Sequence, residues 1–463
     1  MGGGLMKLVA YGAQDIYLTG NHQITFFKVV YRRHTNFSME AIEQTFNGTE
    51  GFGQSVTATI SRNGDLVHRM YLEHDLTYTA PDTLDGKKQE LVTSANYGNR
   101  LMKDVELEIG GQRIDRHYGH WMSVWSQLTE DNPTGTAGAG TPSGNGDEAS
   151  GSRTLFDKMS GNGQGAKTME ADSSTTRGAF TCTNLNATTA AEVSGKIFVP
   201  LQFWFCRNPG LALPLIALQY HEVKVKITFE GIGALLGYDA DNAPSALVAE
   251  TSLATTTTSF KLWADYIYLD TDERRRFAQV SHEYLIEQVQ HAAYSSGGTM
   301  TLNFNHPVKE LVWSKQLPDS IALTTNSDVI KVGSEEPIGD GTFILKLNGH
   351  DRFSERNTKY FTRAQVWQHH TGYGSNLHTD GIAVYSFALK PEEHQPSGTC
   401  NFSRIDNAQL IATNTSDNYN VYAVNYNVLR IMSGMGGLAY SNQSIIYTKI
   451  MKNIFIKIKL KII

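Results

Sequence analysis

Alternation of apolar and charged residues is the dominant pattern along this chain. In residues 104–109 (Asp-Val-Glu-Leu-Glu-Ile) every second side chain is apolar, and Gly110 and Gly111 follow directly. Residues 222–230 repeat the alternation, with valine, isoleucine and phenylalanine at every second position. Because successive side chains of a β-strand point to opposite faces, we predict two antiparallel strands with one buried face each, the first ending in a hairpin turn.

Strand-like segments of the same kind recur in both halves of the chain. We predict further strands at residues 24–31, 55–60, 66–76, 260–269, 343–347, 382–389 and 419–432. Helical periodicity is rare, and we predict short helices at 116–129, at 273–280 after a cap at Asp272, and at 354–367 with Ser354 as the cap. The pattern therefore predicts an all-β protein with a few short helices.

Two polar segments interrupt this pattern. Residues 131–195 are rich in Gly, Ser, Thr and Ala with little apolar periodicity, and residues 243–259 include four consecutive threonines. Loops of this length are unusual within a compact core, but long connections can collect at one end of upright barrels. We predict that both segments are outward-facing loops.

Length and composition narrow the class of protein. A chain of 463 residues is too long for one ordinary core, which predicts two domains of roughly 200 residues each. Forty Lys and Arg against 46 Asp and Glu give a formal charge of -6, which argues against wrapping nucleic acid. The 21 Tyr and 20 Phe suit strands packed face to face in sandwiches.

Neither a secretory signal nor a membrane-spanning segment is predicted. The longest apolar run, residues 211–218, is interrupted by Pro214 and is too short to cross a bilayer. Cys182, Cys206 and Cys400 are widely separated, which argues against a disulfide framework or a zinc ribbon. We therefore expect the protein to be made and kept in the cytosol.

One segment comes close to a nucleotide-binding motif. Residues 161–168 (Gly-Asn-Gly-Gln-Gly-Ala-Lys-Thr) differ from a phosphate-binding loop because Ala166 stands where glycine should precede the lysine. A functional phosphate-binding loop follows a buried strand and precedes a helix, whereas this segment lies within the polar segment 131–195. A nucleotide site is therefore a minority alternative. Cys206 lies in an apolar, aromatic stretch, where a buried and inert thiol is expected.

Histidines form the remaining candidate chemistry. They occur as the pair His117 and His120, as the neighbours His369 and His370, and as His378. A metal site usually needs a third convergent ligand, and the sequence contains no His-Glu-x-x-His motif. We interpret these residues as surface or hydrogen-bonded core histidines, with metal binding as the minority alternative. We predict no catalytic residue, no cofactor-binding residue, no metal ligand and no cofactor.

Longer stretches of the chain resemble one protein family. The opening carries Val-Ala-Tyr-Gly-Ala-Gln-Asp-Ile-Tyr-Leu-Thr-Gly (9–20) and Ile-Thr-Phe-Phe-Lys-Val-Val-Tyr-Arg-Arg-His-Thr-Asn-Phe (24–37), and further matching stretches are 203–214, 281–284, 306–313, 396–404 and 426–440. Together they resemble the major capsid protein of nucleocytoplasmic large DNA viruses that infect algae and amoebae. His22 departs from the family, where a proline is expected, and the match stops after Asn442.

The resemblance implies two tandem eight-stranded antiparallel jelly rolls, a double jelly-roll. We place an N-terminal arm at 1–23, the first jelly roll at 24–219 with a long loop at 131–195, and the second jelly roll at 220–442. Residues 443–463 are rich in isoleucine and lysine, and we interpret them as an appended tail without an essential role. The alternative is a basic amphipathic strand that touches anionic lipid or an internal partner.

The same resemblance implies a structural role. We expect a homotrimeric, pseudo-hexagonal capsomer that tiles an icosahedral shell, assembled in the host cytoplasm and carried in the virion. Expected partners are neighbouring capsomers, minor capsid and vertex proteins and, as an open alternative, the internal viral membrane; direct nucleic-acid binding is not expected. A minor capsid paralogue or a scaffold protein of the same fold is the alternative function. A jelly-roll carbohydrate-binding or enzyme domain is less favoured, because no cluster of acids, aromatics or metal ligands is evident.

Overall fold

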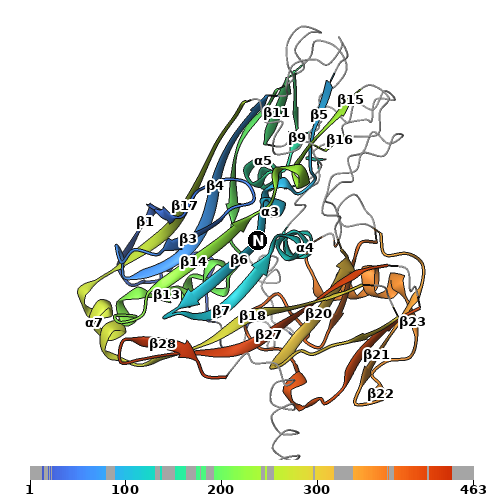
Figure 1. The fold of residues 1–463 in the computed structure, drawn as a ribbon. Coiled ribbons are helices and arrows are strands. Elements are labelled where there is room, and N and C mark those ends of the chain that lie inside the picture. The colour runs from blue at the N-terminus through green and yellow to red at the C-terminus, as the bar shows by residue number, and fades with distance from the viewer. Residues whose placement is uncertain are drawn as a thin grey trace, which may run out of the picture. The chain divides into compact units, whose positions relative to one another are not determined.

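The computed structural model describes residues 23–79, 89–130, 152–162, 192–240, 255–295, 298–316, 337–372, 380–413 and 417–440, together with short pieces before and between them. The predicted tail at 443–463 and much of the predicted loop at 131–195 lie outside the described residues. The chain divides into two compact units, Met1–Phe37 and Ser38–Ile463. The larger unit contains four larger antiparallel sheets, arranged as two β-sandwiches (Figure 1).

The first sandwich is built from a seven-stranded and a five-stranded sheet. In spatial order the larger sheet contains β1 (Phe37–Gln44), β17 (Thr255–Leu269), β4 (Leu66–Thr79), β12 (Glu192–Pro200), β11 (Phe180–Thr183) and β10 (Ser174–Arg177), with β13 (Leu213–Pro214) beside β4. The smaller sheet contains β2 (Phe46–Asn47), β3 (Ser55–Thr59), β14 (Val223–Phe229), β6 (Met102–Ile109) and β7 (Gln112–Tyr118). Side chains from both sheets form one hydrophobic core.

The predicted alternation explains the smaller sheet. Every second residue of β6 and β14 is buried, and the two strands pair so that Leu107 lies opposite Val225. Gly110 and Gly111 connect β6 to β7 with φ angles of 59° and 80°, a left-handed conformation that glycine adopts without steric cost. The predicted strand and its hairpin turn are confirmed.

The second sandwich faces a six-stranded sheet with a five-stranded one. The larger sheet contains β18 (His282–Tyr294), β27 (Tyr419–Met432), β20 (Pro307–Lys315) and β24 (Ile382–Ser386), with β25 (Cys400–Asn401) beside β20 and β28 (Met435–Leu438) beside β27. The smaller sheet contains β19 (Thr299–Thr301), β26 (Ala408–Ala412), β21 (Thr342–Leu347), β22 (His350–Asp351) and β23 (Arg356–Asn357). Trp313, Phe343 and Phe361 contact one another in its core.

Short helices and minor strands complete the described part of the chain. The helices are α3 (Tyr97–Leu101), α4 (Gly119–Thr129), α5 (Leu155–Ser160), α6 (Trp204–Arg207), α7 (Thr271–Gln279), α8 (Gln365–His369), the π-helix η6 (Tyr360–Ala364), and the 3-10 helices η2 (Pro209–Leu211), η3 (Leu215–Ala217), η4 (Ile232–Ala234) and η8 (Phe402–Arg404). The minor strands are β5 (Gln89–Thr93), β15 (Leu236–Ala240) and β16 (Ala246–Leu247) in one sheet, and β8 (Thr136–Ala137) and β9 (Ser152–Arg153) in another.

The sheet pairing corrects the predicted division near residue 219. β14 pairs with β3 and β6, and β17 pairs with β4 along most of its length, so both strands complete the first sandwich. The second sandwich begins with β18, and α7 stands between the two. The apolar stretch at 203–214 resembled a domain end, but strand pairing decides which sheet a later segment completes.

One predicted strand is wrong, and one predicted helix begins three residues later than expected. Residues 24–31 form no strand: their apolar side chains are exposed, from 67% at Ile24 to 99% at Phe27, and no described strand pairs with them. The predicted helix at 116–129 begins at Gly119, because the preceding residues continue the hairpin and pair with β6 as β7. Backbone pairing across the hairpin overrides the local helical pattern.

Three smaller corrections concern later segments. The helix predicted at 354–367 spans Tyr360–His369 as η6 and α8, because Arg356 and Asn357 pair with β21. α7 begins at Thr271, and its cap is Asp270, whose side chain accepts a hydrogen bond from the Thr271 amide. The polar segment 131–195 is not a plain loop, since it contains α5, β10, β11 and the start of β12.

Candidate assembly site at the junction of the sandwiches

Helix α4 fills the junction between the two sandwiches. It follows β7 of the first sandwich, and it buries Trp121, Val124, Trp125 and Leu128. These side chains share a hydrophobic cluster with residues of the larger sheet of the second sandwich: Val289, Val312, Ile382, Val384, Tyr422 and Val424. Burying two tryptophans favours this packing by several kcal/mol, on the order of 2–3 for each side chain. The helix therefore ties the two sandwiches to each other.

A buried ion cluster lies at the same junction. Oε2 of Glu287 on β18 is 2.9 Å from Nη1 of Arg207, which ends α6 of the first sandwich. Oε1 of Glu287 is 2.8 Å from Nζ of the buried Lys309 and 3.2 Å from Nδ1 of His394. Burial alone would raise the pKa of Glu287, but Arg207, His394 and Lys309 outweigh it and lower the pKa to about 2. Glu287 is therefore ionised and joins the two sandwiches electrostatically.

A second cluster centres on His370, directly after α8. Nε2 of His370 is 2.9 Å from Oε2 of Glu310, and Nδ1 is 2.9 Å from Oε1 of Glu392. Carboxylates accept hydrogen bonds, so both ring nitrogens donate and the ring is an imidazolium. Burial would lower the pKa of His370, but the two carboxylates raise it to about 9. The Thr371 amide and hydroxyl also donate to Glu392, both at 2.9 Å.

The candidate histidines of the sequence do not converge on one site. His117 is buried, with Nε2 2.9 Å from Oδ2 of Asp115, and it stacks on Phe203. His120 on α4 has Nδ1 2.7 Å from the Tyr422 hydroxyl. Nδ1 of His369 lies 3.2 Å from the Leu389 carbonyl oxygen, and His378 lies outside the described residues.

No group of three His, Cys, Asp or Glu side chains in the described residues could hold a metal ion. His120, His369 and His370 are hydrogen-bonded as interpreted, whereas His117 is a buried core histidine held by its ion-pair contact with Asp115. Sequence reasoning missed Glu287 and its partners. The available signal was Lys309 and Glu310, a charged pair between the apolar residues Val308 and Leu311 of β20.

The two remaining candidates also lack catalytic geometry. Gly161 ends α5, with a φ of 65° and its amide bonded to the Asp157 carbonyl, so it does not open a helix as a phosphate-binding loop must. Residues 163–168 of that motif lie outside the described residues. Cys206 is buried, and burial raises the pKa of its thiol to about 12. It is therefore an unreactive thiol at neutral pH.

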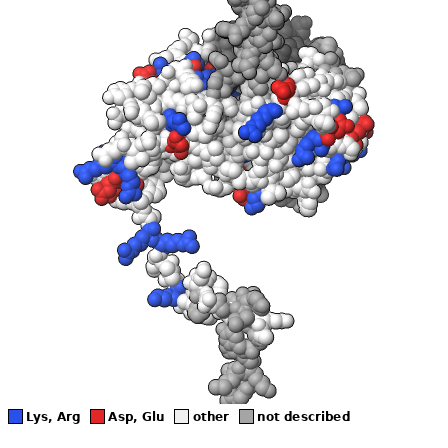
Figure 2. All heavy atoms as spheres, turned by 90° about the horizontal axis from the view of Figure 1, so that it is seen from below, with Lys and Arg blue, Asp and Glu red and all other residues white. Residues whose placement is uncertain are grey.

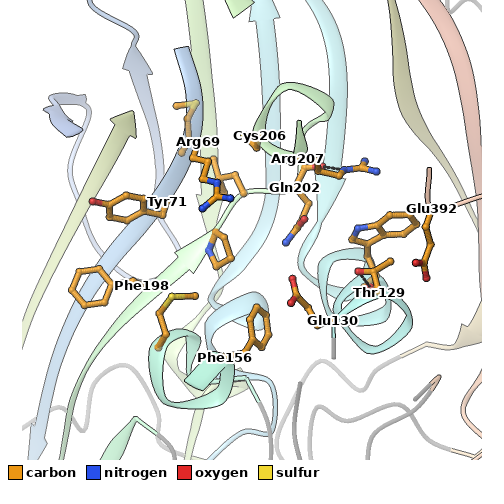
Figure 3. A pocket seen from close by; sticks show the side chains of 15 residues that line it. Arg69, Tyr71, Thr129, Glu130, Phe156, Phe198, Gln202, Cys206, Arg207 and Glu392 are labelled. Carbon is orange, nitrogen blue, oxygen red and sulfur yellow. Dashed lines mark hydrogen bonds between the residues drawn. The ribbon is translucent and has the colours of Figure 1, made fainter. Parts of the chain in front are cut away.

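A cavity of about 700 Å³ adjoins the junction (Figure 3). Its walls come from both sandwiches and carry four aromatic side chains and five residues with charged or amide groups: Tyr71, Trp125, Phe156 and Phe198, and Arg69, Glu130, Gln202, Arg207 and Glu392. The guanidinium of Arg207 stacks over Trp125 at 4.7 Å from the ring centroid. The mixed lining suits a partner with a large aromatic or aliphatic side chain better than a small polar substrate.

On the larger unit, acidic and basic side chains form small mixed groups on the face shown in Figure 2, whereas residues 23–37 of the smaller unit carry Lys28, Arg32 and Arg33 and no acidic residue. Mixed charge of this kind is a poor surface for the phosphate backbone of nucleic acid. Among the described residues, no helix has the length and apolar character needed to span a bilayer. Large exposed apolar side chains occur instead, including Trp367 and Leu389.

Comparison with known proteins identifies the family. Residues 25–270 match the family described as "Major capsid protein N-terminus", and residues 273–437 match "Large eukaryotic DNA virus major capsid protein". The change between the two matches coincides with α7, where the sheet pairing also changes sandwich.

Similar proteins and structures agree with this assignment. The major capsid protein of Pyramimonas orientalis virus is 49% identical over 464 residues, covering 96% of this chain and all of that protein. The major capsid protein of Paramecium bursaria Chlorella virus 1 is 39% identical over 499 residues, with the same coverage. The quasi-atomic model of the PBCV-1 virus capsid superimposes with a TM-score of 0.66 at 36% identity, covering 90% of this chain and 100% of that chain. The Faustovirus major capsid protein, at 15% identity and a TM-score of 0.58, supports the fold alone.

These findings confirm the double jelly-roll fold and the structural role that the sequence predicted. Members of the family are capsid structural proteins and not enzymes. The chain therefore belongs to the major capsid proteins of large eukaryotic DNA viruses.

Proposed function

We propose that this chain forms a homotrimeric capsomer with a pseudo-hexagonal outline that tiles the icosahedral shell of its virus. The observation that carries the proposal is the junction between the two sandwiches, which α4 and the Glu287 cluster close with buried apolar and ionic contacts. A chain with two fixed sandwiches contributes two wedges, so three chains supply six and can imitate sixfold symmetry.

Contacts within the capsomer and between capsomers have different requirements. Within the trimer we expect an obligate interface that buries more than about 2,000 Å² in total. Between capsomers weaker contacts suffice, because their large number stabilises the finished shell while misplaced capsomers can still leave. Neighbouring capsomers, minor capsid and vertex proteins are the proposed partners, with the internal viral membrane as a further candidate. Assembly would take place in the host cytoplasm.

The test is to purify the protein, measure its mass in solution and image it at low resolution by electron microscopy. We expect particles of three times the chain mass of 51.2 kDa, with a hexagonal outline. A stable monomer at micromolar concentration, or a ring with another number of chains, would contradict the proposal. The alternative function, a minor paralogue or scaffold of the same fold, is separated by quantifying the protein in purified virions, where a principal coat protein must be among the most abundant components.

A further inference from the structure

An exposed apolar corner projects from the second sandwich. Trp367 on α8 is 83% exposed and Leu389 is 76% exposed. The hydrogen bond between His369 and the Leu389 carbonyl oxygen, at 3.2 Å, places α8 beside Leu389. The indole N–H of Trp367 has no hydrogen-bond partner in the described chain. A tryptophan this exposed is a typical anchor of a protein interface.

The cavity at the junction offers the complementary chemistry. Figure 3 shows Arg69, Gln202 and Glu130 pointing toward the space between the aromatic side chains. Among the described residues, the Glu130 carboxylate forms neither a side-chain hydrogen bond nor a salt bridge, and partial burial raises its pKa. Arg69 interacts electrostatically with Asp265. The cavity therefore combines aromatic walls with one carboxylate acceptor and one guanidinium.

Both features of an indole fit these groups. A tryptophan ring brings one N–H donor and an electron-rich face, which suit a carboxylate and a guanidinium respectively. The same pairings already occur within this chain. Nε1 of Trp263 donates to Glu73 at 2.6 Å, and Arg207 stacks over Trp125. The exposed corner thus offers an indole N–H and an aromatic face, and the cavity offers a carboxylate and a guanidinium to receive them.

The apolar corner and the cavity are neighbours on one chain. His370, three residues after Trp367, binds Glu392, and Glu392 lines the cavity. The Thr371 hydroxyl donates to the carbonyl of Thr129, which also lines the cavity. A ring of three identical chains needs two different complementary patches on each chain, since the contact in such a ring is heterologous. Adjacent patches of this kind can meet around a threefold axis.

We propose that Trp367 of one copy enters the junction cavity of the next copy, with its indole N–H bonded to Glu130 and its ring against Arg69. Leu389 packs at the rim of the same contact. The inference rests on the proposed trimer, and it adds the residues that close the ring. Each chain then gives one tryptophan and receives one.

The experiment compares Trp367→Ala with a matched control, Tyr220→Ala, which removes an aromatic side chain that is 74% exposed elsewhere on the surface. Association is measured by mass photometry over a dilution series, and the fold is checked by circular dichroism. We expect Trp367→Ala to weaken each contact about 30-fold or more, so that trimers dissociate at concentrations where the wild type and the control remain trimeric. An unchanged dilution curve for Trp367→Ala would overturn the inference.

A double-mutant cycle identifies the partner of the indole. Trp367→Phe keeps a ring but removes the donor, and Glu130→Ala removes the acceptor, so each should weaken association while the pair adds little beyond one of them. Fully additive effects would mean that Trp367 docks elsewhere and would refute the assignment of the cavity. These failures are distinct from failure of the proposed function, because a wild-type protein that is monomeric contradicts the trimer itself. Wild-type trimers that tolerate all variants contradict the inference alone.

Discussion

Two buried histidines show how differently the sandwich interior and the junction treat charge. In the first sandwich, Nδ1 of His74 lies 3.1 Å from the Ser259 carbonyl oxygen and Nε2 lies 3.2 Å from the Tyr97 hydroxyl. Its ring stacks on Phe260 at 4.5 Å, and burial lowers its pKa to about 4. At the junction, His370 lies between two carboxylates and its pKa is raised to about 9. The same side chain is thus neutral in the sandwich interior, where none of the described carboxylates contacts it, and charged at the junction, where two carboxylates flank it.

The two regions are stabilised in different ways. The sandwich interiors consist mainly of apolar side chains, and an ionised group there would lose its hydration without a counter-charge. At the junction, Glu287, Lys309 and His370 are buried as well, but each has an opposite charge within 3 Å. Paired buried charges contribute little net stability, yet breaking a pair is costly. The ion pairs of the junction therefore fix its geometry, while the apolar packing of α4 supplies most of its cohesion.

The largest expected effect comes from breaking the junction at its centre. Glu287→Gln keeps the shape of the side chain but leaves the buried Lys309 and the partly buried Arg207 without their carboxylate. We expect a loss of about 3–5 kcal/mol in the free energy of unfolding, measured by denaturant titration. The matched control is Glu283→Gln on the same strand, whose pair with Arg430 is 2.8 Å long but exposed. The control should leave stability unchanged, and equal losses in both variants would contradict the contrast between the two kinds of pair.

The elements that sequence analysis predicted well are those with a repeated local pattern. β27 spans Tyr419–Met432 as predicted, and the β6–β7 turn at Gly110 and Gly111 is correct, because alternation and paired glycines act locally. The prediction failed where pairing between distant residues decides the outcome. β17 returns to pair with β4 from the far side of the predicted boundary. No local feature of 255–269 indicates which sheet it completes.

The candidate site was predicted far less completely. The positions of the histidines in the sequence indicated His117 and His370 as candidates, but not the residues that contact them. Glu392 contacts His370 because α8 and β24 pack against each other in the fold. Long-range contacts of this kind have no periodic signature. The family resemblance supplied the fold and function, whereas the chemistry of the junction required coordinates.

A second, smaller effect is the response of the junction to alkaline pH. The pKa of His370 is raised from an ordinary value of 6.5 to about 9, so its contribution is complete below pH 6.5 and is lost as the pH rises through 9. The size of the shift corresponds to about 3 kcal/mol of unfolding free energy. We expect stability to fall between pH 7 and 9.5 in the wild type, measured by denaturant titration at each pH. His370→Gln should show a flatter profile over this range, and an unaltered slope would contradict the assignment.

The smallest expected effect is the loss of stability at acid pH that is caused by His74, the neutral histidine in the first sandwich. His74 has a pKa lowered to about 4, so below pH 6.5 the unfolded chain binds a proton that the folded chain excludes. Stability therefore falls as the pH decreases from 6.5 toward 4, by about 2 kcal/mol at pH 5 from this residue. His120 lies on α4 at the junction but none of the described carboxylates contacts it, and burial lowers its pKa to about 3, so it adds to the same loss of stability at acid pH. His74→Gln should remove the contribution of His74 and leave that of His120, so its stability profile between pH 6.5 and 5 should be shallower but not flat. If the loss of stability between pH 6.5 and 5 were identical in wild type and His74→Gln, the sandwich interior would accept a charged His74 as the junction accepts a charged His370, and the contrast between these two histidines would fail.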